Sequence, residues 1–280
     1  MKFRTLAATF AAVFLTSQAQ AQSVPPPRMN IPEASSTPGF TMGAGLALDY
    51  VTNAKCNVSG FAVSCTSASA SAFALSPSLW AQLDRVRLQV TIPVVDIEGP
   101  GTLTGVLNGG PQISGTATGP TTRRTGLGDI SVGGAVILLP ESAFTPRLEI
   151  GGVVKLPTGR NGLGTGQRDY GLQLMFYHQL GAGFQTFGSV GRQWITDPVT
   201  LHQNSAPGAS LGLEFNHKYF GAGAELDYSQ SMFAGLPHSL SIEPYVTWRP
   251  FGSDLGIQVY TAFGLTDSTP NHGIGFRLVL

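Results

Sequence analysis

The sequence has few charged residues and, after its first segment, no long apolar run. Only 11% of its 280 residues are charged, with 16 basic and 16 acidic side chains, whereas an ordinary soluble domain carries about 25%. This composition argues against a soluble globular protein, and zero net charge without a basic cluster gives no reason to expect nucleic acid as a partner. Gly, Ser, Asn or a charge interrupts every later apolar stretch, which excludes membrane-spanning helices.

Cofactor signatures are also missing. The sequence contains no metal-ligand spacing, phosphate-binding loop or dinucleotide fingerprint, so we expect no cofactor. Its two cysteines, Cys56 and Cys65, lie in a Ser/Thr/Asn-rich stretch with no His, Asp or Glu between them. A disulfide between them is the predicted arrangement in an exported chain, and a metal pair or a reactive thiol is the alternative.

The N-terminal segment has the features of an export signal. Two basic residues precede a short apolar run and a polar stretch that ends in Ala19-Gln20-Ala21. This pattern predicts a secretory signal over 1–21, cleaved after Ala21. For 22–40, rich in Pro and small polar residues, we expect a flexible periplasmic tail or a partial plug of a barrel that spans 41–280.

Apolar and polar residues alternate with period two along most of the mature chain. In 239–248, for example, the even positions are Leu, Ile, Pro, Val and Trp, and the odd positions are Ser, Ser, Glu, Tyr and Thr. Such a strand has one apolar and one polar face. Many of these segments reach the roughly 9–11 residues that a tilted membrane-spanning strand needs. The predicted strands are 41–51, 70–82, 84–95, 126–138, 146–157, 169–180, 184–195, 208–218, 221–231, 238–249, 254–265 and 272–280.

The connections between these segments alternate in length. Tight turns such as 181–183 and 219–220 follow longer loops such as 52–69 and 96–125. Short periplasmic turns, long outer loops and an even strand count are typical of bacterial outer-membrane barrels. We therefore predict an all-β, antiparallel transmembrane β-barrel of about 12 strands in the outer membrane of a Gram-negative bacterium. Aromatic residues near strand ends are expected at the membrane interface, and ordinary aromatic packing is the alternative for each of them: Tyr50, Trp80, Trp194, Tyr219 and Trp248.

Four residues do not fit this simple pattern. Pro77, Pro93 and Pro244 lie inside predicted strands, where proline removes a hydrogen-bond donor, and we expect bulges or strand ends there. Arg192 has the lipid-facing parity of its strand. We expect a register shift at the neighbouring glycines, and contact with a lipopolysaccharide phosphate is the alternative.

The polar parity predicts what lines the lumen. A barrel of this size should hold an intermediate lumen, partly filled by side chains, and hence a narrow, gated or plugged pore. Its acidic majority would favour cations if the path were wet, whereas ion pairs that bridge the lumen are the alternative interpretation. The candidate lumen-lining residues are Asp49, Arg87, Asp129, Glu149, Lys155, Asp169, Glu214, Glu225, Asp227, Glu243 and Arg277.

Three motifs occur in order: Gly126-Leu-Gly-Asp-Ile130, Lys155-Leu-Pro-Thr-Gly159 and Leu163-Gly-Thr-Gly-Gln-Arg-Asp-Tyr170. With them the chain resembles the outer-membrane protein family named for the meta-pathway (MetA-pathway) of phenol degradation. The resemblance implies a transporter-like barrel, associated with uptake of aromatic or other hydrophobic compounds. The motifs have a structural interpretation as strand ends and tight turns, and Asp129, Lys155 and Asp169 are their candidates for lining the path.

The favoured function is a channel or transporter for small solutes, hydrophobic or aromatic compounds among them, and we expect no enzyme. The expected partners are outer-membrane lipids and lipopolysaccharide, the solute and the barrel-assembly machinery. One alternative is a structural or surface-binding barrel that meets partners through 52–69 and 96–125. A less favoured alternative is an outer-membrane lipid hydrolase, with candidates in the outer loops: His202, His238, His272, Ser205, Ser239 and Ser268.

Overall fold

A computed structural model gives the fold of the chain. It describes residues 39–54, 57–59, 62–64, 70–100, 106–107, 110–111, 121–160, 163, 167–194, 205–230, 238–252, 255–266 and 272–279. The predicted signal and both cysteines, Cys56 and Cys65, lie outside the described residues. No helix among those residues is long and apolar enough to cross a membrane.

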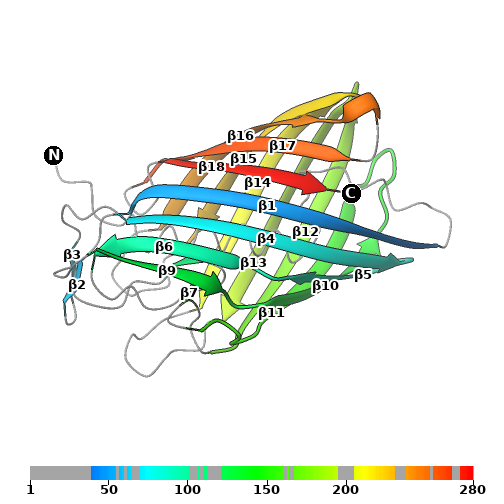
Figure 1. The fold of residues 1–280 in the computed structure, drawn as a ribbon. Helices are drawn as coiled ribbons and strands as arrows, with labels where there is room; N and C mark the ends of the chain where they lie inside the picture. Colours follow the sequence, from blue (N-terminus) through cyan, green and yellow to red (C-terminus); the bar gives the residue numbers. More distant parts are fainter. Residues whose placement is uncertain are drawn as a thin grey trace.

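Antiparallel strands form one closed wall (Figure 1). Closure comes from β1, which pairs with β18 on one side and with β4 on the other, so that Gly45 faces both Val279 and Ser78. The strands of the wall are β1 (Phe40–Ala54), β4 (Ala70–Leu83), β5 (Val86–Thr91), β6 (Val94–Pro100), β9 (Thr121–Leu127), β10 (Ser131–Leu139), β11 (Arg147–Lys155), β12 (Asp169–Gly181), β13 (Phe184–Trp194), β14 (Ala206–Asn216), β15 (Phe220–Ser229), β16 (Ser239–Trp248), β17 (Gly256–Gly264) and β18 (His272–Val279).

Four short strands pair outside this wall. They are β2 (Asn57–Ser59) with β3 (Ala62–Ser64), and β7 (Val106–Leu107) with β8 (Gly110–Pro111). The other element of the described residues is a short 3-10 turn, Pro250–Gly252.

Two of the barrel's strands are interrupted. Along one side of β4, β6 pairs with the N-terminal half (71–75) and β5 with the C-terminal half (78–83). Beyond them, β9 pairs with β6 and β10 pairs with β5. Counting β5/β6 and β9/β10 as one strand each gives twelve, which confirms the predicted barrel. The predicted strands 84–95 and 126–138 are therefore longer than expected and broken in the middle.

The three prolines lie at irregular points of the ladders, as expected. Pro93 separates β5 from β6, and Pro77 lies where β4 changes partner between them, its carbonyl accepting from the Ile92 N–H at 3.0 Å. Pro244 pairs with Ala224 on β15, but the ladder between β16 and β17 omits its position. Each missing N–H thus falls where the ladder is already interrupted.

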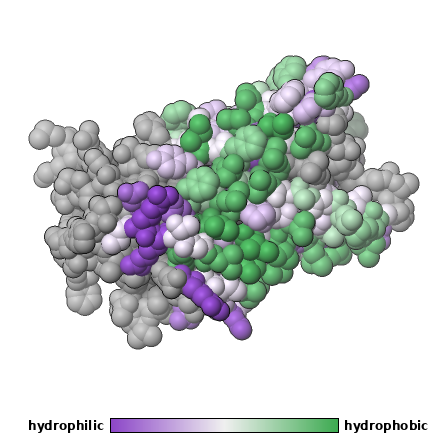
Figure 2. Space-filling model, in the orientation of Figure 1, coloured by the Kyte–Doolittle hydropathy of each residue, from purple (hydrophilic) through white to green (hydrophobic). Residues whose placement is uncertain are grey.

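The outer surface is apolar and the inside is polar, as the alternation predicts. Large apolar side chains are exposed on every part of the wall, and Figure 2 shows them as a green belt on one face, with a hydrophilic strip over β6 and β9 at its loop end. Trp194, Trp248, Tyr50 and Tyr219 are exposed. Trp80 is not: it shares the inward parity of Gln82, and its indole Nε1 is buried, so the interface prediction was wrong for this residue.

Arg192 does not mark a register shift. β13 pairs with β12 and β14 without irregularity from Phe187 to Arg192. The residues on either side, Gly191 and Gln193, face inward, while Arg192 is exposed on the outer surface. The expected register shift is therefore wrong: the regular ladder leaves Arg192 on the outward-facing side of its strand.

Candidate functional site: the barrel interior

The polar parity collects ionisable side chains inside the wall. Ten of the eleven candidates are buried, each with no more than 4% of its surface exposed, and Asp227 is half-buried. Buried charge is costly unless it is paired and hydrogen-bonded. The interaction partners of these buried groups divide the interior into two regions of different construction.

The first region holds the residues of the three motifs. Lys155 Nζ lies 2.6 Å from Asp169 Oδ2 and 3.2 Å from Asp129 Oδ2, and all three side chains are buried. Lys155 and Asp169 are cross-strand neighbours on β11 and β12, whereas Asp129 lies in the break between β9 and β10. One ammonium group thus joins the broken strand to two continuous ones.

Thr158 bridges the same break by hydrogen bonds between its side chain and the backbone. Its hydroxyl accepts from the Ile130 N–H at 2.8 Å and donates to the Gly128 carbonyl at 3.1 Å. The Gly159 N–H donates to Asp129 Oδ1 at 2.9 Å. These bonds replace the ladder partners that the interruption removes. We call this set of contacts, together with Lys155, the motif clasp.

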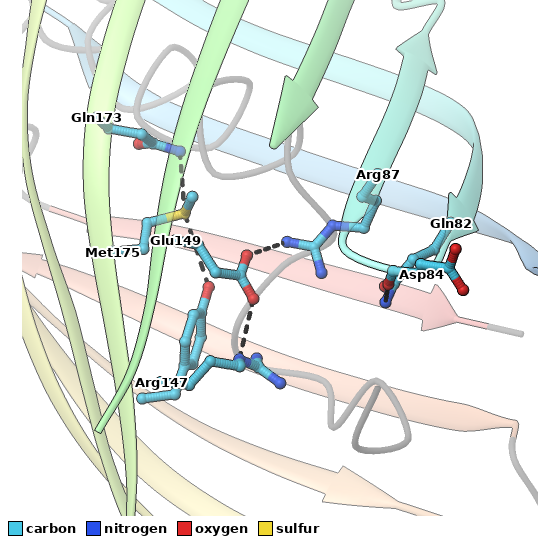
Figure 3. A network of polar contacts seen from close by, with 8 residues as sticks. Gln82, Asp84, Arg87, Arg147, Glu149, Gln173 and Met175 are labelled. Atoms are coloured by element: carbon cyan, nitrogen blue, oxygen red, sulfur yellow. Dashed lines mark hydrogen bonds and ion pairs between the residues drawn. The ribbon is translucent and has the colours of Figure 1, made fainter. Parts of the chain in front are cut away.

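A second ion-pair cluster lies on the neighbouring strands (Figure 3). Arg87 Nη2 on β5 and Arg147 Nε on β11 approach the Glu149 carboxylate from two sides, at 2.6 and 2.9 Å. The Arg147 guanidinium also lies over the ring of Tyr177 on β12, 4.3 Å from its centroid. The Tyr177 side chain is buried, and its hydroxyl donates to Met175 Sδ at 3.7 Å. Together with the motif clasp, this cluster forms what we call the ion-pair wall.

Across β14, β16, β17 and β1 the carboxylates have tyrosine partners instead. Tyr245 donates its hydroxyl to Glu214 Oε2 at 2.8 Å, and Tyr260 donates to Asp49 Oδ1. The guanidinium of Arg277 lies over the Tyr260 ring, 4.0 Å from its centroid. We call this region the tyrosine–carboxylate wall.

Aromatic rings in the interior lie against glycines of the neighbouring strand. Three ring atoms of Phe187 lie 2.2–2.8 Å from where a Cβ of Gly212 would stand, and atoms of Tyr260 come within 2.1–2.3 Å of the same position at Gly275. Any larger residue would push the ring off the wall. The sequence shows these aromatics on the polar parity, but only the register pairs each with its glycine.

At the turn end of the barrel, Arg249 ties two connections together. Its Nη2 donates to Asn216 Oδ1 at 2.9 Å and its Nη1 to the His217 carbonyl at 3.1 Å. Burial lowers the pKa of this guanidinium from its usual value, and the nearby Glu214 charge partly offsets the effect. The role of this residue is to hold the turns.

Two of the residues proposed for a lipid hydrolase, Ser205 and His238, contact other side chains in the described part of the chain. The Ser205 hydroxyl accepts hydrogen bonds from Arg192, and the His238 ring stacks near Tyr228 with centroids 5.4 Å apart. His202 and Ser268 lie outside the described residues. No three His, Cys, Asp or Glu side chains gather as a metal site within the described ranges.

The chain matches a sequence family over most of its length and is similar in fold to a solved outer-membrane channel. The sequence profile of a family described as "Putative MetA-pathway of phenol degradation" matches residues 35–280. An outer-membrane channel from Pseudomonas putida F1 has a similar structure, with a TM-score of 0.65 and 13% identity over 89% of this chain and 98% of that one. The CymD monoaromatic hydrocarbon channel aligns over 95% and 96% of the two chains, with 10% identity and a TM-score of 0.48. No curated protein sequence matches the chain.

Proposed function

Because the chain belongs to the family of the MetA-pathway of phenol degradation, we propose that this outer-membrane barrel is a channel for small hydrophobic compounds, aromatic ones above all. The observation that carries the proposal is that interior rings lie close against glycines of the neighbouring strand, Phe187 over Gly212 and Tyr260 over Gly275. Both rings are buried at rest, with 0% and 1% of their surfaces exposed, so a solute reaches their faces by displacing the interior side chains that cover them. Aromatic faces bind other aromatic rings by offset or edge-to-face packing.

The guanidinium groups above the rings suggest how such a path is closed at rest. Arg277 covers Tyr260, and Arg147 covers Tyr177. A cation over a ring gains about 0.5–2 kcal/mol, and a second ring in the same place gains about 0.5–1.5 kcal/mol beyond the area that it buries. Since the two contacts are similar in strength, little ring-contact energy is lost when an aromatic solute takes the place of the arginine.

A flux measurement tests the proposal. The refolded barrel is placed in vesicles, and the transfer of a fluorescent naphthalene derivative is followed with and without Gly212→Val. The new side chain forces Phe187 off the wall, so we expect most of the protein-dependent flux to be lost. Gly152→Ala is the matched control, because its nearest neighbour is a carbonyl at 3.6 Å. Unchanged flux in Gly212→Val would contradict the ring-lined path.

Single-channel conductance tests for an aqueous path beside the apolar one. We expect discrete steps with a cation preference that Asp129→Asn and Asp169→Asn reduce, because acidic groups outnumber basic ones inside. A correctly folded barrel without conductance would contradict the aqueous path.

We further propose a cleaved signal over 1–21, a tail or partial plug over 22–40 and a Cys56–Cys65 disulfide in the first outer loop. Lipopolysaccharide and the barrel-assembly machinery are the proposed partners in a Gram-negative outer membrane. The intact mass of the exported protein tests the first and third points together. It should start at Gln22 and gain two hydrogens on reduction.

A further inference from the structure

Two arginines point outward near the loop end of the barrel, and they differ in the kind of side chain that accepts their hydrogen bonds. Arg123 on β9 holds Asp96 on β6 through Nε and Nη2, at 3.0 and 2.5 Å. Arg192 on β13 is also exposed, but both of its hydrogen bonds, from Nε at 2.9 Å and Nη2 at 2.5 Å, end on the hydroxyl of Ser205. A hydroxyl orients a guanidinium without neutralising it.

The surroundings of Arg192 are those of a lipid-facing surface. Its outward neighbours along and across the strands are Leu172, Val190 and Trp194, all exposed and all apolar or aromatic. A guanidinium stays charged at any relevant pH, and a lipid-facing charge is tolerated close to the membrane interface but costly at mid-depth. The side chain must therefore reach the headgroup region.

Its direction agrees with this requirement. Ser205 directly precedes Ala206, which is the partner of Gln193, so the guanidinium extends towards the loop end of the wall. That end is the outer one, because the connections at the other end are the short ones: 84–85, 140–146, 182–183, 217–219 and 249–255. Trp194, two residues further on, marks the interface.

We propose that Arg192, positioned by Ser205, binds a phosphate of the phosphorylated glycolipid that forms the outer leaflet. The bonds to Ser205 use the Nε–Nη2 edge of the guanidinium, so the phosphate is proposed to bind the Nη1–Nη2 edge. Two parallel N–H donors on that edge match two phosphate oxygens. The inference rests on the membrane orientation of the barrel and is independent of what the lumen transports.

Native mass spectrometry of the refolded barrel in a zwitterionic detergent tests the site. Bound lipid is counted as diphosphorylated lipid A is added, with dephosphorylated lipid A, phosphatidylglycerol and inorganic phosphate as separate probes. We expect Arg192→Gln to weaken binding of diphosphorylated lipid A about ten-fold, the usual effect of one charged hydrogen-bonding group. Ser205→Ala should weaken it less, because it removes the positioning hydroxyl and leaves the charge.

Arg123→Gln is the matched control and should bind lipid A like the parent, because Asp96 already neutralises Arg123. Equal losses in Arg123→Gln and Arg192→Gln would overturn the site, as would equal binding of dephosphorylated lipid A. Equal binding of phosphatidylglycerol or of free phosphate at Arg192 would overturn the assignment to the glycolipid. Arg192→Gln should fold normally, since it removes a charge from the lipid-facing surface, and its naphthalene flux should match the parent.

Discussion

The ion-pair wall and the tyrosine–carboxylate wall face the same lumen and bury the same kind of acid, yet they satisfy it differently. In the first, Lys155, Arg87 and Arg147 bring full positive charges to buried carboxylates. In the second, Glu214 and Asp49 accept from tyrosine hydroxyls. The ion pairs occur beside the broken strands β9/β10 and β5/β6. The tyrosines lie on β16 and β17, which are continuous strands although the ladder between them omits Pro244.

This difference suggests a division of labour. Where the ladder is interrupted, ion pairs and the Thr158 hydroxyl replace the lost backbone bonds. Where the strands themselves are continuous, the interior side chains replace fewer backbone bonds, and rings can form the surface that meets a solute. Stability should therefore depend on the first wall and solute passage on the second.

The largest effect is expected from Lys155→Met. It leaves Asp129 and Asp169 buried side by side without their shared cation, and breaking a buried pair in this way costs about 3–5 kcal/mol. Urea unfolding of the barrel in vesicles measures the loss. Adding Asp129→Asn and Asp169→Asn should recover most of it, and failure to do so would show that charge is not the cause.

Thr158→Val should cost about 2 kcal/mol, because the Ile130 N–H and the Gly128 carbonyl lose their partner at the break and each unsatisfied group costs about 1–3 kcal/mol. The matched control is Thr186→Val, whose hydroxyl donates to the Gly212 carbonyl within a continuous ladder. The same unfolding measurement compares the two. Equal losses would mean that the motif clasp has no special role.

A loss of about 1 kcal/mol is expected from Tyr245→Phe, since the neutral hydroxyl donor to Glu214 disappears and Asn216 Nδ2 still donates to that carboxylate. Its flux of the naphthalene derivative should be unchanged, because the ring remains. A cost as large as that of Lys155→Met would remove the proposed difference between the walls.

The smallest effect is expected at the exposed Asp96–Arg123 pair. The Arg123 side chain is 67% exposed, and water and salt screen such surface pairs. Arg123→Gln should leave the unfolding midpoint unchanged at physiological salt. A clear shift would show that β6 and β9 depend on this pair as the interior depends on Lys155.

The sequence predicted much of this arrangement because strand parity is a local property. Alternation alone assigned the candidate acids and bases to one face of each strand, and the structure buries ten of those eleven side chains. It predicted strand irregularities at Pro93 and Pro244, since proline lacks a donor wherever it lies. The prediction failed at Trp80 and Arg192. For these residues, the general preference of tryptophan for the membrane interface and of arginine for a polar environment was given more weight than strand parity.

By itself, then, the sequence determined the barrel, its apolar outside and the polar character of its inside, because all three follow from period-two patterning and segment length. The tertiary structure alone decided the partners: Lys155 between Asp129 and Asp169, Tyr260 on Asp49, and Phe187 over Gly212. Those contacts depend on the register between strands that are far apart in the chain, as with Asp49 on the first strand and Tyr260 on the second last. No local pattern encodes that register.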